Sequence, residues 1–249
     1  MRQLWRFLAL GVGVYLLILL ATFPATRAVH FLEQQNTGLT LQSVSGTVFS
    51  GQAGRVLHSG QELGPVSWSF RPVALLLGRV EYRVTFDGPL FRGSGYLGTG
   101  FGAEFNAHDV VGELQPDPLV NRYLPVPMET AGSISLTLDT LKVSDGFPAD
   151  LSGIVQWTEA AILEPVQLSF GKVEVNLGGS GDAVTAGISS AGGATAVSGE
   201  LTLLAAGEYR LQLLLKPGPE TDPGFTDMLE SYGKPQADGA FLITDSGEW

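Results

Sequence analysis

The chain of 249 residues contains no cysteine, and this absence removes several kinds of chemistry at once. Disulfides, thiolate metal sites and a cysteine nucleophile are all excluded. The absence does not exclude an oxidising compartment, because the roughly 220 residues that follow the first apolar stretch are enough to bury a core without covalent staples.

Histidine is also scarce, and no catalytic motif surrounds the three that are present. His30, His58 and His108 are far apart in the sequence and lack the spacing of a metal site, although His58 and the His108–Asp109 pair can meet in space. No Gly-x-Ser-x-Gly elbow accompanies the serine-rich turns. The glycine-rich stretch 87–102 contains GSGYLG, but a strand-like run follows it instead of the helix that a phosphate loop requires. The sequence therefore predicts no enzyme, no metal and no cofactor; a hydrolase remains a hypothesis that would need distant His and carboxylates to converge.

Positive charge is rare in the distal half of the chain. Residues 101–249 carry six basic and 21 acidic side chains, a net charge of -15, whereas residues 1–32 carry +3 and residues 33–100 carry +1. Nucleic-acid binding needs clustered Lys and Arg, so it is excluded for this half. The acidic excess favours a soluble body that does not lie on an anionic membrane.

One long apolar run is present, from Phe7 to Ala25. At about 1.5 Å per residue its helix would be roughly 28 Å long, close to the thickness of the hydrocarbon core of a bilayer. Arg2 and Arg6 precede the run and no acidic residue does, which places the N-terminus in the cytoplasm. We expect a cytoplasmic tip (1–6), a transmembrane anchor (7–25) and a body on the other side (26–249). A cleaved signal peptide is the alternative, with Thr26 and Ala28 as a poor fit to the small residues that a cleavage site has at positions -3 and -1.

The body is predicted to be antiparallel β-structure. Short segments of alternating apolar and polar residues follow one another without the helices that parallel crossovers need. The expected strands lie in the ranges 39–51, 52–57, 66–70, 80–86, 110–114, 132–143, 151–160, 166–177, 196–204, 209–216 and 241–244. Short helices are expected over 25–35, 72–78 and 225–232. The fold class is thus all-β, a curved sheet or a sandwich, with a few short helices.

Three features of the body carry further expectations. The glycines of 87–102 are expected to serve turns and bulges between short strands. The small residues of 178–193 indicate a weak edge strand with its loops, and the proline-rich segment 116–127 is a candidate joint between sub-domains. Trp68 and Trp157 are the large aromatic residues most suited to the core or to partner contacts.

The order of these pieces resembles the type II secretion system protein N family (GspN). The resemblance spans the chain: a basic start with an anchor ending near Pro24, LTLQSVSGTVFSGQA at 39–53, LGPVSWSFRPVALLLGRV at 63–80, and LSGIVQWTEA at 151–160. These are strand motifs, not chemistry. The resemblance implies a single-pass inner-membrane protein of the Gram-negative envelope, with a periplasmic body and no catalytic residues, that supports export of folded proteins.

Two functions follow from these expectations. The first is an accessory subunit that contacts other secretion components through its body and the bilayer through residues 7–25, with no small-molecule substrate. The second is a membrane-anchored periplasmic lipid-handling protein, because a sheet with one apolar face, as at 134–138 and 211–215, must cover that face with protein or with an apolar ligand.

Overall fold

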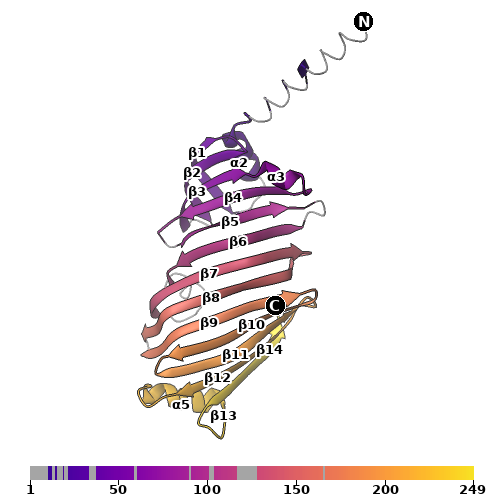
Figure 1. The fold of residues 1–249 in the computed structure, drawn as a ribbon. Coiled ribbons are helices and arrows are strands. Elements are labelled where there is room, and N and C mark those ends of the chain that lie inside the picture. Colours follow the sequence, from indigo (N-terminus) through magenta and orange to yellow (C-terminus); the bar gives the residue numbers. More distant parts are fainter. Residues whose placement is uncertain are drawn as a thin grey trace. The chain divides into compact units, whose positions relative to one another are not determined.

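The structure is a computed structural model that describes residues 11, 12, 15, 19, 22–33, 38–58, 61–89, 91–100, 104–116, 128–164 and 166–249. The chain divides into two compact parts, residues 1–89 and 90–249. The described residues form fourteen strands, all paired antiparallel, and three short helices (Figure 1). This confirms the all-β prediction. Each part is one open sheet, so the curved sheet is correct and the sandwich is not.

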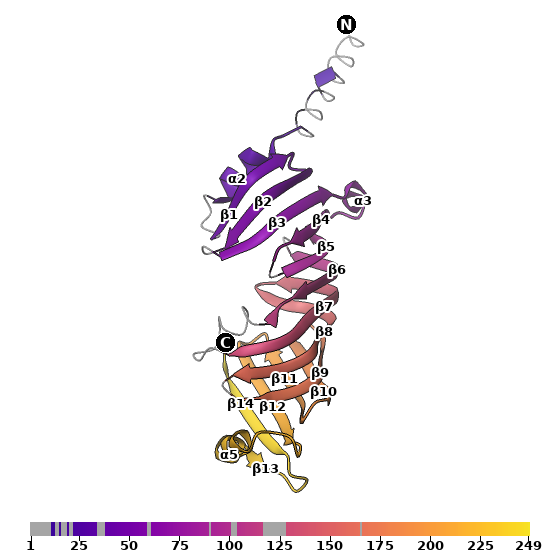
Figure 2. The ribbon, with the colours of Figure 1, turned by 90° about the vertical axis from the view of Figure 1, so that its left-hand side faces the viewer.

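The first part is a four-stranded meander with two helices. Its strands pair in sequence order, and helix α2 packs against β1 (Figure 2). The elements are α2 (Ala25–Glu33), β1 (Leu39–Gly46), β2 (Ser50–His58), β3 (Gln61–Phe70), α3 (Pro72–Leu75) and β4 (Val80–Asp87). Pro72 begins α3 and Gly78, at φ 72°, ends the turn after it, as the sequence predicts.

The core of residues 1–89 lies on one face of this sheet. Ala53, Val56 and Val66 are its buried residues, and Trp68 and Phe86 are among the half-buried side chains that pack on them. Val66 pairs with Ala53 on one side and with Phe86 on the other. The period of two along β3 therefore places Val66 and Trp68 together, because alternate side chains of a strand share a face.

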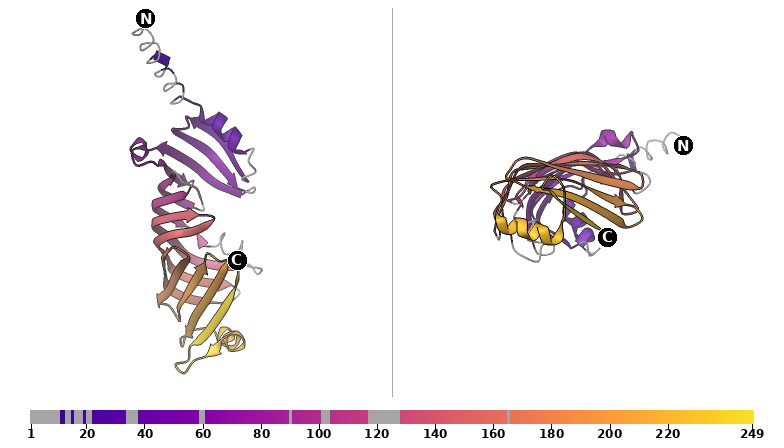
Figure 3. Two further views of the ribbon diagram at one scale, coloured as in Figure 1. Left: turned by 90° about the vertical axis from the view of Figure 1, so that its right-hand side faces the viewer. Right: turned by 90° about the horizontal axis from the view of Figure 1, so that it is seen from below.

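The second part is a sheet of ten strands. Their order across the sheet is β5-β6-β7-β8-β9-β10-β11-β12-β14-β13. The first five are β5 (Phe91–Thr99), β6 (Phe105–Leu114), β7 (Glu129–Ser144), β8 (Phe147–Glu164) and β9 (Leu168–Ser180). The others are β10 (Ala183–Gly192), β11 (Thr195–Leu204), β12 (Glu208–Pro217), β13 (Lys234–Pro235) and β14 (Phe241–Glu248). Figure 3 shows that these strands curve across the part.

Tight turns keep neighbouring strands in register. Asp145 and Gly146 join β7 to β8, and both have positive φ, 51° and 81°. A two-residue turn with positive φ at both positions twists in the same sense as the flanking strands, which explains the Asp-Gly sequence. A second tight turn joins β11 to β12, which confirms the strands expected over 196–204 and 209–216.

Helix α5 (Pro223–Tyr232) is the longest helix of the second part. The Asp222 carboxylate accepts a hydrogen bond from the Gly224 N–H at 2.7 Å, and Pro223 occupies the first turn. Phe225 and Leu229, four residues apart, are the buried side chains of the helix. They attach α5 to the sheet.

One expectation about strands was wrong and a second was correct only in part. The segment 178–193 contains β10, which pairs with β9 on one side and β11 on the other, so it is an interior strand and not an edge. Its small side chains therefore do not indicate a lack of neighbouring strands. The expectation for the glycines of 87–102 is partly correct, because Gly88 follows β4 and Gly100 follows β5. Gly93, Gly95 and Gly98 lie inside β5, with one register shift between Ser94 and Tyr96.

The expected anchor and joint fall largely outside the described residues. Arg2, Arg6 and most of 7–25 belong to this group, as do residues 117–127 of the proposed joint. Within the described part of the chain, no helix is long and apolar enough to cross a membrane.

Candidate functional site

The largest surface feature of residues 90–249 is a continuous apolar sheet face. Successive register pairs join apolar side chains from strand to strand, so they share one face. We call this set the apolar face: Ile134, Leu136, Leu138, Val155, Trp157, Val173, Val175, Leu177, Val184, Ala186, Ile188, Val197, Leu201, Leu203, Leu211, Leu213, Leu215, Phe241 and Ile243.

Among the described residues, helix α5 covers one end of the apolar face. Phe225 and Leu229 of α5 form a buried cluster with strand residues that include Ala160, Phe170 and Phe241. Away from α5, Val184 is buried, whereas other side chains of the face, such as Leu136 and Leu213, are only half-buried. Much of an aliphatic surface that spans seven strands therefore remains accessible.

Glycines on the same face leave space that leucine side chains of neighbouring strands fill. A Cβ added to Gly153 would lie 2.7 Å from Leu138 Cδ2, and one added to Gly199 would lie 2.9 Å from Leu213 Cδ2. Each leucine thus lies flat over the glycine of a neighbouring strand. The result is a shallow surface of methyl groups, with no polar side chain between them at these positions.

The opposite face is polar and hydrogen-bonded. Glu174 accepts hydrogen bonds from Gln156 Nε2 at 3.0 Å and from Asn176 Nδ2 at 3.3 Å, and Lys172 Nζ lies 3.4 Å from it. The hydrogen bond from Asn176, followed by that from Lys172, holds the pKa of the Glu174 carboxyl below its usual range. This face is built for contact with water or with polar protein surfaces.

A tyrosine–aspartate pair marks one border of the apolar face, between β12 and β14. The Tyr209 hydroxyl donates a hydrogen bond to Asp245 Oδ2 at 2.9 Å. This hydrogen bond and the negative charge of Asp245 raise the pKa of Tyr209.

The two tryptophans singled out from the sequence lie in different parts of the chain. The indole N–H of Trp68 donates to the carbonyls of Thr47 and Val48 at 3.2 and 3.1 Å, which ties β3 to the β1–β2 turn. Trp157 donates to the Ala131 carbonyl at 2.9 Å and packs beside the cluster under α5. Both are half-buried, with their polar atoms satisfied inside the chain.

Groups suited to chemistry do not gather elsewhere in the described residues. His108 stacks on Tyr96 and lies 3.0 Å from its neighbour Asp109. No cluster of His, Asp or Glu in the described part of the chain is arranged to hold a metal. An open hollow of about 430 Å³ in residues 1–89 is lined chiefly by hydroxyls, with Gln52 and Arg83. Hydroxyls without a neighbouring base can bind a polar group but are not activated as nucleophiles.

Sequence reasoning identified the alternation but missed the extent of the apolar face. Alternation assigns each residue to one of two faces of its own strand, whereas continuity across strands depends on register. The signal that was available is the recurrence of apolar residues at alternate positions in successive segments from 134 to 215.

Comparison with known proteins identifies the family of the chain, which the geometry of its surfaces does not. The family model described as "Type II secretion system (T2SS), protein N" matches residues 37–244. A type II secretion system protein N from Aeromonas hydrophila is 30% identical over 251 residues, covering 99% of both chains. One from Vibrio cholerae is 27% identical over 219 residues, covering 85% of each. No solved structure matches the chain. The chain therefore belongs to the type II secretion system protein N family.

Proposed function

We propose that the chain is an accessory subunit of the type II secretion apparatus. Residues 7–25 anchor it in the inner membrane, with Arg2 and Arg6 on the cytoplasmic side and residues 26–249 in the periplasm. It acts by protein–protein contacts that support export of folded proteins across the outer membrane, without turnover of a substrate. The observation that carries this proposal is the match to a type II secretion relative along 99% of the chain.

Two surfaces of residues 90–249 suit such contacts. The polar face presents Thr137 and Lys172, both exposed. The outer edge of β14 pairs with β13 only at Phe241 and Leu242, so its backbone from Ile243 to Glu248 has no strand partner among the described residues on that side. An open edge of this kind accepts an added strand from a partner.

Photocrosslinking in native membranes tests this function. A photoreactive residue is placed at Thr137, Lys172 or Thr244, and at Leu17 in the anchor as a lipid-facing reference. We expect the three body positions to capture a few defined envelope proteins and Leu17 to capture phospholipid as well. Capture of phospholipid alone at the body positions would contradict an assembly role.

A second function, the handling of lipid, is favoured by the apolar face. Backbone groups of the interior strands are already paired on both sides, so an added peptide strand has nothing to bond there, whereas an acyl chain needs only dispersion and burial. The test is mass spectrometry of lipid that co-purifies with the protein. Leu136→Asn should reduce the bound lipid, and the adjacent Thr137→Asn, on the polar face, should not. Reproducible absence of lipid from the unmodified protein would exclude this function.

A further inference from the structure

The loop that joins β3 to β4 exposes a compact group of aliphatic side chains. Val73 is 61% exposed, Leu75 53%, Leu76 86% and Leu77 74%, while only Ala74 of α3 is buried. Leucines exposed to this degree and adjacent to one another are unusual on a soluble surface, and such patches mark contact sites. We call residues 71–80 the leucine loop.

Backbone hydrogen bonds hold the leucine loop in this exposed conformation. Leu76, Leu77 and Gly78 donate to the carbonyls three residues earlier, at 3.0 to 3.1 Å. The Arg79 N–H donates to the Ala74 carbonyl at 3.0 Å, and the Arg71 N–H donates to the Glu81 carbonyl at 2.9 Å. The leucines therefore lie on a turn whose backbone is held by its own hydrogen bonds.

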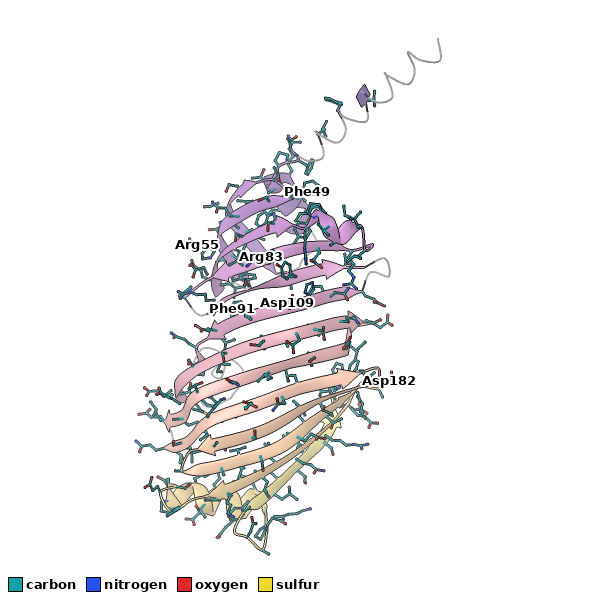
Figure 4. The ribbon with its side chains drawn as sticks, viewed as in Figure 1. Phe49, Arg55, Arg83, Phe91, Asp109 and Asp182 are labelled. Carbon is teal, nitrogen blue, oxygen red and sulfur yellow. The ribbon has the colours of Figure 1, made fainter. Side chains whose placement is uncertain are left out.

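The leucine loop lies at the end of the sheet where the chain arrives from its apolar run. Because the strands are antiparallel, the loop shares this end with the β1–β2 turn. Pro24 bridges to Thr47 in that turn, and the Val48 N–H donates to the Phe23 carbonyl at 3.1 Å. The Phe70 N–H donates to the Phe49 carbonyl. Figure 4 shows Phe49 and Arg55 toward opposite ends of the strands. Phe23 lies near the end of the apolar run. Hydrogen bonds therefore connect it to the β1–β2 turn, and connect that turn to the end of β3, where the leucine loop begins.

The chemistry of this end fits a lipid surface. The Phe49 and Phe70 rings meet edge to face at 5.2 Å, and Tyr82 lies 5.4 Å from Phe70. Aromatic side chains of this kind concentrate at membrane interfaces. Arg71 Nη1 pairs with Glu81 Oε1 at 2.9 Å, so its charge is balanced within the chain, whereas Arg79 follows the leucines and is exposed. Aliphatic side chains next to an exposed arginine complement the acyl chains and anionic headgroups of a phospholipid surface.

We propose that the leucine loop is a second membrane contact, which rests on the membrane anchoring by residues 7–25 proposed above. Leu76 and Leu77 enter the boundary between headgroups and acyl chains, and Arg79 lies among the phosphates. A single anchor does not fix how residues 23–89 are oriented to the bilayer. Two contacts at one end of the sheet fix that orientation.

Because the chain contains no cysteine, a single introduced cysteine can be labelled at one chosen position. The full-length chain is labelled with an environment-sensitive fluorophore through Leu76→Cys, Leu17→Cys or Glu62→Cys and reconstituted into vesicles of phosphatidylethanolamine and phosphatidylglycerol. Glu62, paired with Arg55 at the opposite end of the sheet, is the aqueous control. The emission of the fluorophore at position 76 should shift to the blue, and lipids with a nitroxide near the headgroup should quench it most. Leu17 should be quenched most by a deep nitroxide, and Glu62 by neither. Adding Arg79→Gln to the Leu76 variant should weaken its quenching.

The reference positions separate the possible failures. Quenching at Leu17 but not at Leu76 would overturn the inference while leaving the anchor intact. Absence of quenching at both positions would reject the anchor together with the inference. Quenching at Glu62 equal to that at Leu76 would show that the whole part lies on lipid, which also contradicts a contact specific to the loop.

Discussion

At the scale of single residues, the sheet depends on glycines that are covered by their neighbours. A Cβ at Gly199 would lie 2.2 Å from the Gln212 carbonyl oxygen, whereas one at Gly187 would find only the Asn176 oxygen at 4.0 Å. Neither glycine has a positive φ, so the contrast concerns space alone. We expect Gly199→Ala to lower the free energy of unfolding by about 1–3 kcal/mol, because backbone must move to admit the methyl group.

Gly187→Ala is the matched control, one strand away in β10. It should be neutral or slightly stabilising, because alanine restricts the unfolded chain more than glycine does. Urea unfolding of the full-length protein in detergent measures both variants. Equal losses of stability in the two would contradict the argument from space.

The Glu174 carboxyl gives a prediction about pH. Its pKa is depressed in the folded protein, so its contribution to stability is present above the unfolded pKa of about 4.3 and is lost as the pH falls through the folded value. Titration by NMR should place its pKa below the ordinary range. Asn176→Ala, which removes the leading hydrogen bond, should raise that pKa. A Glu174 pKa unchanged by this substitution would refute the assignment of the cause.

Both tryptophans are easy to find in the sequence, but their partners are not. Trp68 and Trp157 are large residues in strand-like segments, which predicts partial burial. Their indole hydrogen bonds reach Thr47 and Ala131, more than twenty residues away. No local pattern encodes a carbonyl acceptor at that distance, because it depends on strand pairing that is set by the whole sheet.

At the scale of elements, periodicity and turn residues were reliable guides. The alternation at 80–86 and 132–143 gave β4 and β7, and Pro72 with Gly78 gave α3. The prediction failed for β10, because a run of small residues does not by itself indicate an edge strand. Ala186 and Gly187 pair with β9 on one side and with β11 on the other, and only the pairing of both flanking strands reveals this.

Helix α5 is attached to the sheet by one buried face, and this attachment can be tested by substitution. Leu229 is 2% exposed within the cluster on the sheet, whereas the adjacent Met228 is 45% exposed. We expect Leu229→Ala to cost about 2–5 kcal/mol, since it leaves a cavity beneath the helix. Met228→Ala should change stability by less than about 0.5 kcal/mol. Denaturant melts of the two variants provide the comparison, and a large loss with Met228→Ala would show that the helix packs by its other face.

At the scale of the whole molecule, the sequence predicted the fold class and the family, but not where each surface lies. The family resemblance rested on strand motifs such as those at 39–53 and 151–160, and the match over residues 37–244 confirms it. The apolar face and the leucine loop emerged only from the structure. The first requires the register of seven strands, and the second requires the exposure of the leucines in and after α3, which no local pattern encodes.

The two parts of the chain have separate buried clusters, and this predicts separable unfolding. The cluster of residues 1–89 centres on Ala53, Val56 and Val66, and that of residues 90–249 lies under α5. Because neither buried cluster contains a residue of the other part, Val56→Ala should lower the midpoint of one transition and Leu229→Ala that of another. Hydrogen exchange with mass spectrometry, followed through a denaturant series, assigns each transition to its peptides. A single transition shifted equally by both substitutions would show instead that the chain unfolds as one cooperative unit, in which case a substitution in either cluster would destabilise both parts.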